Sequence, residues 1–129
     1  GIDRIVMLGS GKTLAIDEKI REQDWPDILL EYWSDAGRRS PGWVVKDLAC
    51  DYIAYAFVPT QICYLLPFQQ LRRVWIEHGS AWVDHGKKKE LGFRLVEAKN
   101  NGWITISVAV PIDLLLVAIE NAMRVEWSA

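Results

Sequence analysis

A glycine-rich triplet, residues 9–11, separates two short apolar runs near the beginning of the sequence. The runs span residues 5–8 and 13–16, and strand-forming residues on both sides of a short glycine-containing segment are typical of a β-hairpin. If Ser10 is the middle of a three-residue loop, residues whose numbers add up to 20 face each other across the two strands. This register fixes which polar side chains meet, so it constrains the chain more than any other feature.

The register places two acidic residues directly opposite each other. Asp3 faces Asp17, while the alternation of side chains puts Lys19 on the same face as Asp17 and Glu18 on the other face. Facing carboxylates repel each other, and one lysine neutralises only half of their charge. A sheet that keeps such a pair usually has a cation to hold. The alternative is an exposed polar hairpin face with an ordinary Asp–Lys ion pair, which contributes little to stability.

The spacing Asp-x13-Asp-x-Lys, formed by Asp3, Asp17 and Lys19, resembles the motif of the PD-(D/E)XK nuclease superfamily. Members of this superfamily share the restriction-endonuclease-like fold. Four flanking segments add to the resemblance: Gly1-Ile2-Asp3-Arg4, Ile16-Asp17-Glu18-Lys19, Leu30-Glu31-Tyr32 and Pro41-Gly42-Trp43. The resemblance covers about residues 1–58. Beyond that segment, only the general mixture of strands and helices agrees.

The resemblance implies a nuclease that uses Mg2+, or Mn2+ in its place, to hydrolyse phosphodiester bonds, with DNA as the expected substrate. Asp3 and Asp17 would hold the metal, with the backbone carbonyl of Glu18 as a third ligand, and Mg2+ prefers such hard oxygen ligands. A metal held in this way polarises a phosphodiester and generates hydroxide near neutral pH. Lys19 would position or activate the attacking water and offset charge on the phosphate.

Glu31 is a candidate accessory acid. It stands between Leu30 and Tyr32 in an otherwise apolar run, and a carboxylate in such surroundings is costly unless it is paired or bound to a metal. We therefore expect Glu31 beside Asp17 or, alternatively, at a strand edge where it faces solvent. Because the chain starts at Gly1, immediately before the motif, we also expect a further helix upstream in the full protein.

The rest of the chain alternates between strand-like and helix-like patterns. β-Branched and aromatic runs predict strands at residues 27–33, 51–58, 61–65, 93–98 and 103–110. Helical spacing of apolar residues predicts helices at residues 43–49, 67–78 and 111–123. Residues 81–91, which are mostly polar, are predicted to form a loop. These patterns predict an α/β fold in which a mixed β-sheet is flanked by helices, as in the restriction-endonuclease-like fold.

Composition limits the size of the fold and the kinds of partner. Half of the 129 residues are hydrophobic, which predicts a single domain spanning residues 1–129. The net charge is −2, so any surface that binds nucleic acid must be local. The preferred DNA contacts are three basic residues near the motif: Arg38, Arg39 and Lys46. The longest apolar stretch, residues 104–119, is interrupted and too short to span a membrane. Two cysteines without a CxxC pair predict reduced thiols, so we expect a soluble, cytoplasmic protein.

Residues 8–13 resemble a phosphate-binding loop only superficially. The full pattern needs a glycine five residues before Gly11, where Val6 stands, and it needs a helix where residues 14–16 are strand-like. We therefore exclude a phosphate-binding loop at residues 8–13.

Two other functions remain open. The first is a non-catalytic member of the same fold, which binds nucleic acid or a protein partner and forms homodimers through an apolar surface. The second is a plain interaction module, in which the acidic face of the hairpin is incidental.

Overall fold

The computed structural model describes residues 2–128 and begins with the expected hairpin. Strand β1 (Arg4–Met7) pairs antiparallel with β2 (Thr13–Arg21), and the numbers of every residue pair in this ladder add up to 20. The loop is closed by a hydrogen bond of 2.7 Å from the Leu8 N–H to the Lys12 carbonyl. Gly11 has a φ of 86°, a left-handed conformation that glycine adopts without steric cost. The predicted register is therefore confirmed.

The chain divides into two compact units. The first contains the described residues of Gly1–Trp25, Leu48–Leu71 and Ile119–Ala129, and the second contains Pro26–Asp47 and Arg72–Ala118. The strands form two separate sheets rather than the single mixed sheet that the sequence predicts. The fold-class prediction is confirmed as a mixture of strands and helices, with strands in the majority.

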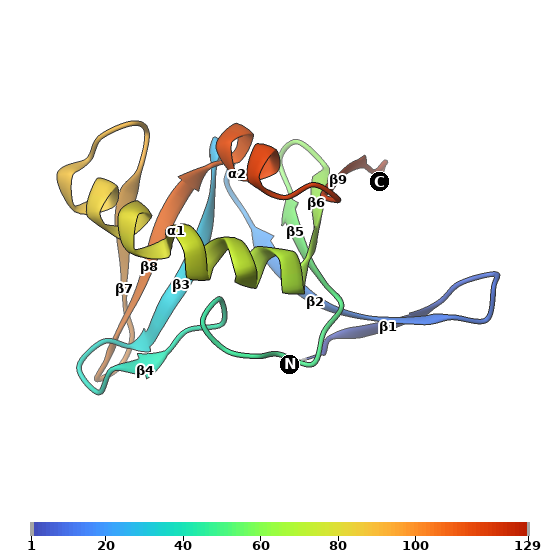
Figure 1. Ribbon diagram of the computed structural model, residues 1–129, viewed down its shortest axis with the longest axis horizontal. Coiled ribbons are helices and arrows are strands. Elements are labelled where there is room, and N and C mark those ends of the chain that lie inside the picture. Colours follow the sequence, from blue (N-terminus) through green and yellow to red (C-terminus); the bar gives the residue numbers. More distant parts are fainter. Residues whose placement is uncertain (1, 129) are drawn as a thin grey trace. The chain divides into compact units, whose positions relative to one another are not determined.

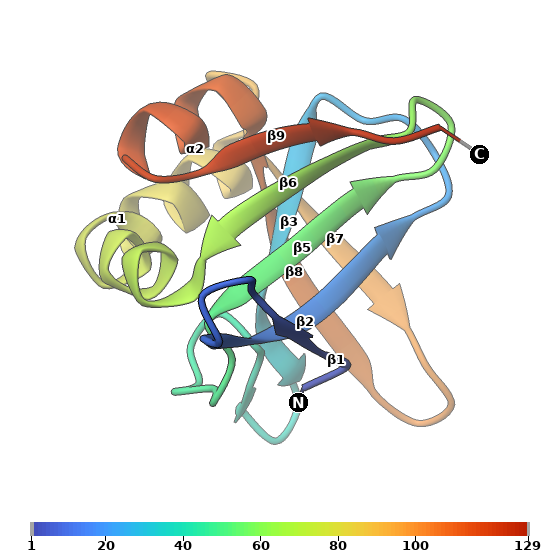
Figure 2. The ribbon, with the colours of Figure 1, turned by 90° about the vertical axis from the view of Figure 1, so that its right-hand side faces the viewer.

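A mixed five-stranded sheet forms the first unit, in the order β1-β2-β5-β6-β9 (Figure 2). Its remaining strands are β5 (Tyr52–Phe57), β6 (Ile62–Pro67) and β9 (Met123–Glu126). Strand β5 runs parallel to β2, and the other neighbouring strands are antiparallel. The odd-numbered side chains of β5 are at most 2% exposed, so this face of the sheet is the core face of the unit.

An antiparallel four-stranded sheet forms the second unit, in the order β4-β3-β8-β7 (Figure 1). The strands are β3 (Asp27–Asp35), β4 (Ser40–Pro41), β7 (Arg94–Lys99) and β8 (Ile104–Pro111). Helix α2 (Ile112–Ala118) follows β8 directly. Helix α1 (Phe68–Lys88) begins in the first unit and continues from Arg72 in the second. The two central strands supply the fully buried side chains Ile28, Leu30, Val108 and Val110.

Helix α1 continues to Lys88, through most of a segment that the sequence predicts to be a polar loop. Trp82 explains the extension, because it is 5% exposed and lies about two turns beyond Trp75 on the apolar stripe of the helix. Its ring packs edge-on against Trp75, with 6.5 Å between ring centroids. An ion pair of 3.0 Å between Lys88 and Asp84 adds to the last turns. The charged residues of the segment thus cover the outside of a helix whose inner face is aromatic.

The helix predicted at residues 43–49 is wrong, since this segment consists of turns. Its backbone follows strand β3 instead: the N–H of Gly42 donates to Tyr32 O at 2.9 Å, and the N–H of Val44 donates to Glu31 O at 3.2 Å. A Cβ atom on Gly42 would lie 2.3 Å from Glu31 O, so only glycine allows this close approach.

The C-terminal helix is shorter than predicted. Helix α2 ends at Ala118, and strand β9 follows where the prediction extends the helix to residue 123. The Asn121 N–H donates to Gln70 Oε1 at 3.3 Å in the connection. All four residues of β9 are exposed, so its sequence carries no pattern of burial that would reveal a strand.

Cys50 and Cys63 are both free thiols, as the sequence predicts. Within residues 2–128, neither helix combines the length and the apolar character that a membrane crossing would need.

Candidate active site

The carboxyl groups of Asp3 and Asp17 meet at the open end of the hairpin. Asp3 precedes β1, and its N–H donates to Ile16 O at 2.9 Å, which holds it against β2. Its Oδ2 accepts the backbone N–H of Glu18 at 2.8 Å. From this position the Asp3 carboxyl lies within hydrogen-bonding reach of the Asp17 carboxyl, so one proton can be held between them. The hairpin register therefore produces the acidic pair that it predicts.

Lys19 completes the cluster. Its Nζ lies 3.1 Å from Asp17 Oδ2. The Asp17 residue is only 4% exposed, whereas the Lys19 side chain keeps 30% of its surface exposed. Asp17 is thus the buried centre of the cluster, with a carboxyl group on one side and an ammonium group on the other.

The two carboxyl groups have pKa values that are pushed apart. Burial raises the pKa of Asp17 and the hydrogen bond with Asp3 raises it further, while Lys19 acts in the opposite direction. The same carboxyl–carboxyl hydrogen bond lowers the pKa of Asp3, and the N–H of Glu18 lowers it as well. Two carboxylates in contact are costly when both are ionised, and a bound cation removes that cost.

A pH dependence of metal binding follows from the raised pKa of Asp17. Carboxylates bind metal in their ionised form, so a proton on Asp17 competes with the metal. We expect affinity for Mn2+ to be constant above this pKa and to fall by up to about tenfold per pH unit as the pH decreases through it. Calorimetric titration with Mn2+ over a pH series measures the effect. An affinity that stays flat down to the ordinary value of 3.8 would contradict the assignment of Asp17 as a ligand.

The Glu18 backbone, and not its side chain, lies beside the acidic cluster. Its carboxylate lies on the opposite face of β2, where it forms an ion pair with Arg4, as the alternation of side chains predicts. In an extended strand, the N–H and C=O of one residue point to the same edge. Because the Glu18 N–H reaches Asp3, the Glu18 carbonyl is directed to the edge on which Asp3 lies.

The donors of this cluster fit Mg2+ better than a structural metal. Two carboxylates and one carbonyl are hard oxygen ligands, and Mg2+ typically takes one or two carboxylates and keeps several waters. In the part of the chain that the structure describes, no three His, Cys, Asp or Glu side chains gather where they could hold a metal ion, so the side chains of this cluster supply only the two carboxylates.

Glu31 lies on β3, in the four-stranded sheet of the second unit, and not in the sheet that carries Asp17. Its side chain is partly exposed, and a bulge in the pairing of β3 with β8 falls between Glu31 and Trp33. Its backbone carbonyl is occupied by the N–H of Val44. Glu31 therefore does not share a sheet with Asp17, and its backbone is bordered by β8 and by Val44 rather than lying at a free strand edge.

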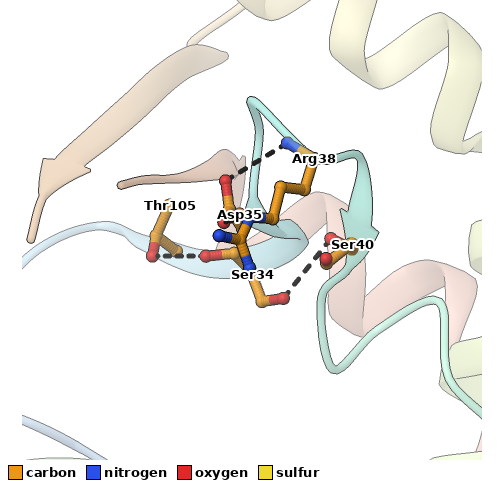
Figure 3. Close-up of polar contacts among 5 residues, drawn as sticks. All are labelled: Ser34, Asp35, Arg38, Ser40 and Thr105. Atoms are coloured by element: carbon orange, nitrogen blue, oxygen red, sulfur yellow. Dashed lines mark hydrogen bonds and ion pairs between the residues drawn. The ribbon is translucent and has the colours of Figure 1, made fainter. Parts of the chain in front are cut away.

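Arg38 lies in the tight turn between β3 and β4 (Figure 3). Arg39 lies in the same turn. Asp35 Oδ1 accepts the Arg38 N–H at 3.3 Å, and the Arg38 side chain is 87% exposed. Arg39 follows in a left-handed conformation with a φ of 54° and is exposed. Lys46 is also exposed and lies farther along the same segment. These three cations belong to the second unit, whereas Asp3, Asp17 and Lys19 belong to the first.

Hydrogen bonds around the turn fix its shape. The Ser34 hydroxyl donates to Ser40 O at 3.4 Å, and the Thr105 hydroxyl of β8 donates to Ser34 O at 3.0 Å (Figure 3). Both bonds connect the turn to the sheet, so Arg38 is presented from a defined backbone rather than from a loose loop.

Arg21 was not among the site residues predicted from the sequence, although it lies on the same face of β2 as Asp17 and Lys19. Its Nη1 donates to the hydroxyl of Tyr55 at 2.7 Å. The alternation of side chains that groups Asp17 with Lys19 also includes residue 21, so this position was detectable. Its partner was not, because Tyr55 stands on a strand that is distant in sequence.

A hollow of about 780 Å3 lies on the opposite face of the five-stranded sheet. It is mostly apolar, and small side chains at Ala54 and Ala56 form part of its lining. The ion pair between Arg4 and Glu18 lies at this hollow as well. It offers no pair of carboxylates in contact, so it is not the candidate catalytic centre.

Comparison with known proteins gives no family assignment: no family model matches the chain, and no curated protein or solved structure shows significant similarity to it.

Proposed function

We propose that this chain is a Mg2+-dependent nuclease that hydrolyses phosphodiester bonds in DNA, with the active site of the restriction-endonuclease-like fold. The observation that carries the proposal is the contact between Asp3 and the buried Asp17, with Lys19 at 3.1 Å from Asp17. When both carboxyl groups of such a pair are ionised, a bound cation offsets their repulsion. The spacing of the residues matches the PD-(D/E)XK motif. A cytoplasmic location accords with the two free thiols.

Each side chain of the cluster has a distinct part in this proposal. Asp3 and Asp17 hold the metal, and the Glu18 N–H orients the Asp3 carboxylate. Bound Mg2+ supplies a Lewis acid for the phosphate and lowers the pKa of a coordinated water. The Lys19 ammonium orients the attacking water and stabilises the negative charge that develops on the phosphate.

DNA is the proposed polymer because exposed cations are available to its backbone. Arg38, Arg39 and Lys46 are the proposed contacts, and such contacts position a duplex without reading its sequence. The net charge of −2 gives the chain no overall attraction to the DNA backbone. We therefore propose that a second copy of the chain or a protein partner adds to its affinity for DNA.

The second candidate function is binding without catalysis. The apolar hollow beside Ala54 and Ala56 favours it, because pockets of this size and character commonly take a ligand or side chains of a partner. A protein of this kind would shift DNA on a gel, or bind a partner, and would never cut DNA.

Incubation with supercoiled plasmid, with Mg2+, with Mn2+ or with excess EDTA, tests the proposed function. We expect nicked or linear plasmid with either metal and intact plasmid in EDTA. Intact plasmid in every lane, together with a gel shift in EDTA, would replace the nuclease with the binding function. Intact plasmid and no shift would overturn both.

A further inference from the structure

Arg21 continues the row of polar side chains that contains Asp17 and Lys19. It is the last residue of β2 and is partly buried. Alternate residues of a strand are about 6.6–6.8 Å apart along its axis. The row therefore carries, in order, a carboxylate, an ammonium group and a guanidinium group on one face of one strand.

The hydrogen bond of Arg21 draws its guanidinium group toward the acidic cluster. In the parallel ladder, Arg21 lies opposite Phe57, and Tyr55 lies opposite Lys19. The bond from Arg21 Nη1 to the Tyr55 hydroxyl therefore runs diagonally, back along β2 in the direction of Lys19. Tyr55 is 2% exposed and packs against Phe57 with 5.4 Å between ring centroids, so its hydroxyl is a fixed anchor.

The charge of Arg21 is not neutralised where it stands. Its hydrogen-bond partner is a neutral phenol, and within residues 2–128 no carboxylate lies at ion-pair distance from it. Five other arginines do form ion pairs with acidic groups: Arg4, Arg38, Arg72, Arg94 and Arg124. A partly buried cation without a counterion is costly, and an anionic ligand would remove that cost.

The charge balance of the row indicates the ligand. Asp3 and Asp17, when ionised, balance Lys19 and Arg21, so a bound Mg2+ leaves two positive charges. Two consecutive phosphodiester groups carry two negative charges. Tyr55 engages one of the five N–H groups of the guanidinium, and the others remain able to grip a phosphate in the bidentate manner typical of arginine.

We propose that Arg21, anchored by Tyr55, forms a phosphate-binding subsite for the nucleotide next to the scissile bond. The inference rests on the proposed nuclease function, because it places the scissile phosphate at Asp3 and Asp17. Arg21 is a substrate-binding residue in this account, and Tyr55 is a positioning residue that acts through it.

The test measures binding of a short fluorescent DNA duplex in EDTA across a series of salt concentrations. For Arg21→Gln we expect about tenfold weaker binding and a slope of log K against log salt that is smaller by about 1, as for one lost phosphate contact. Arg21→Lys should keep the slope and recover part of the affinity. Tyr55→Phe should also keep the slope, and in the cleavage assay it should raise KM more than it lowers kcat.

Arg124→Gln in β9 is the matched control, because Arg124 is exposed and paired with Glu126 in the same unit. If Arg21→Gln matches the wild type and Arg124→Gln in affinity and slope, the subsite is overturned. Thermal melts show whether each variant folds. If Arg21→Gln does not fold, the test uses Arg21→Lys and Tyr55→Phe, and a KM equal to that of the wild type in both variants overturns the subsite.

The wild type separates this inference from the proposed function. A wild type that cuts plasmid while Arg21→Gln keeps its KM overturns the subsite alone. A wild type that binds DNA through Arg21 and never cuts overturns the nuclease and leaves a phosphate-binding site. A wild type that neither binds nor cuts overturns both.

Discussion

Replacing Lys19 by alanine is expected to reduce the rate of metal-dependent DNA cleavage by about 10²–10⁴-fold, the range typical for loss of one group that acts in the transition state. The Lys19 ammonium is 3.1 Å from Asp17 and is the only side-chain cation for which an ion pair with this carboxylate is seen in residues 2–128. Its loss leaves the metal ligands in place, so DNA affinity in EDTA should change by no more than about tenfold. Initial rates of plasmid nicking at saturating Mg2+ measure the effect.

Lys12→Ala is the matched control for this variant. Lys12 lies in the loop of the same hairpin, is exposed, and contributes its backbone carbonyl rather than its side chain to the loop. Its cleavage rate should equal that of the wild type. A Lys19→Ala variant that folds and cuts at the wild-type rate would remove Lys19 from the mechanism.

Asp17→Asn is expected to abolish cleavage and, in the absence of metal, to make the protein more stable at neutral pH. The pKa of Asp17 is raised above its ordinary value of 3.8, so the folded state holds the protonated form better than the unfolded state does. The stability that protonation of Asp17 supplies is fully present below pH 3.8, the ordinary pKa of the group, and is lost as the pH rises through the raised pKa of the folded state. At neutral pH the ionised Asp17 therefore destabilises the fold. An asparagine amide removes this charge and can donate to the Asp3 carboxylate.

The free energy of unfolding should increase by about 1 kcal/mol, which corresponds to about 3–6 °C in melting temperature for a chain of this size. Thermal melts with and without Mg2+ measure it: metal should stabilise the wild type and leave Asp17→Asn unchanged. Asp24→Asn, at an exposed position of the same unit, is the control and should not shift the melting temperature. If Asp17→Asn has a lower melting temperature than the wild type in EDTA, the acidic pair stabilises the fold by itself and is not a site that requires a bound cation.

The hairpin could be predicted in detail because its signals are local. The position of Gly11 sets the loop, the loop sets the register, and the alternation of side chains then decides which residues join Asp17. Local rules of this kind place Asp3 opposite Asp17 and send the Glu18 side chain to the other face. No distant part of the chain has to be known.

The rest of the fold depends on contacts between distant segments. Strand β3 follows β2 in sequence but pairs with β4 and β8, and no local pattern in β3 distinguishes this pairing from one with β2. Helix α1 passes through a lysine-rich segment because Trp82 is buried, which the polar composition of that segment conceals. The role proposed for Arg21 depends on its hydrogen bond with Tyr55, which can form only when β5 pairs with β2.

The proposed nuclease function requires that Asp3 and Asp17 together hold one divalent cation. Diffraction from crystals grown with Mn2+, recorded at a wavelength where manganese scatters anomalously, tests it most directly. We expect one anomalous peak within about 2.5 Å of a carboxylate oxygen of Asp3 and of Asp17, with the Glu18 carbonyl turned toward it. A map with no peak between these two carboxylates, or with the two side chains turned away from each other, would contradict the account.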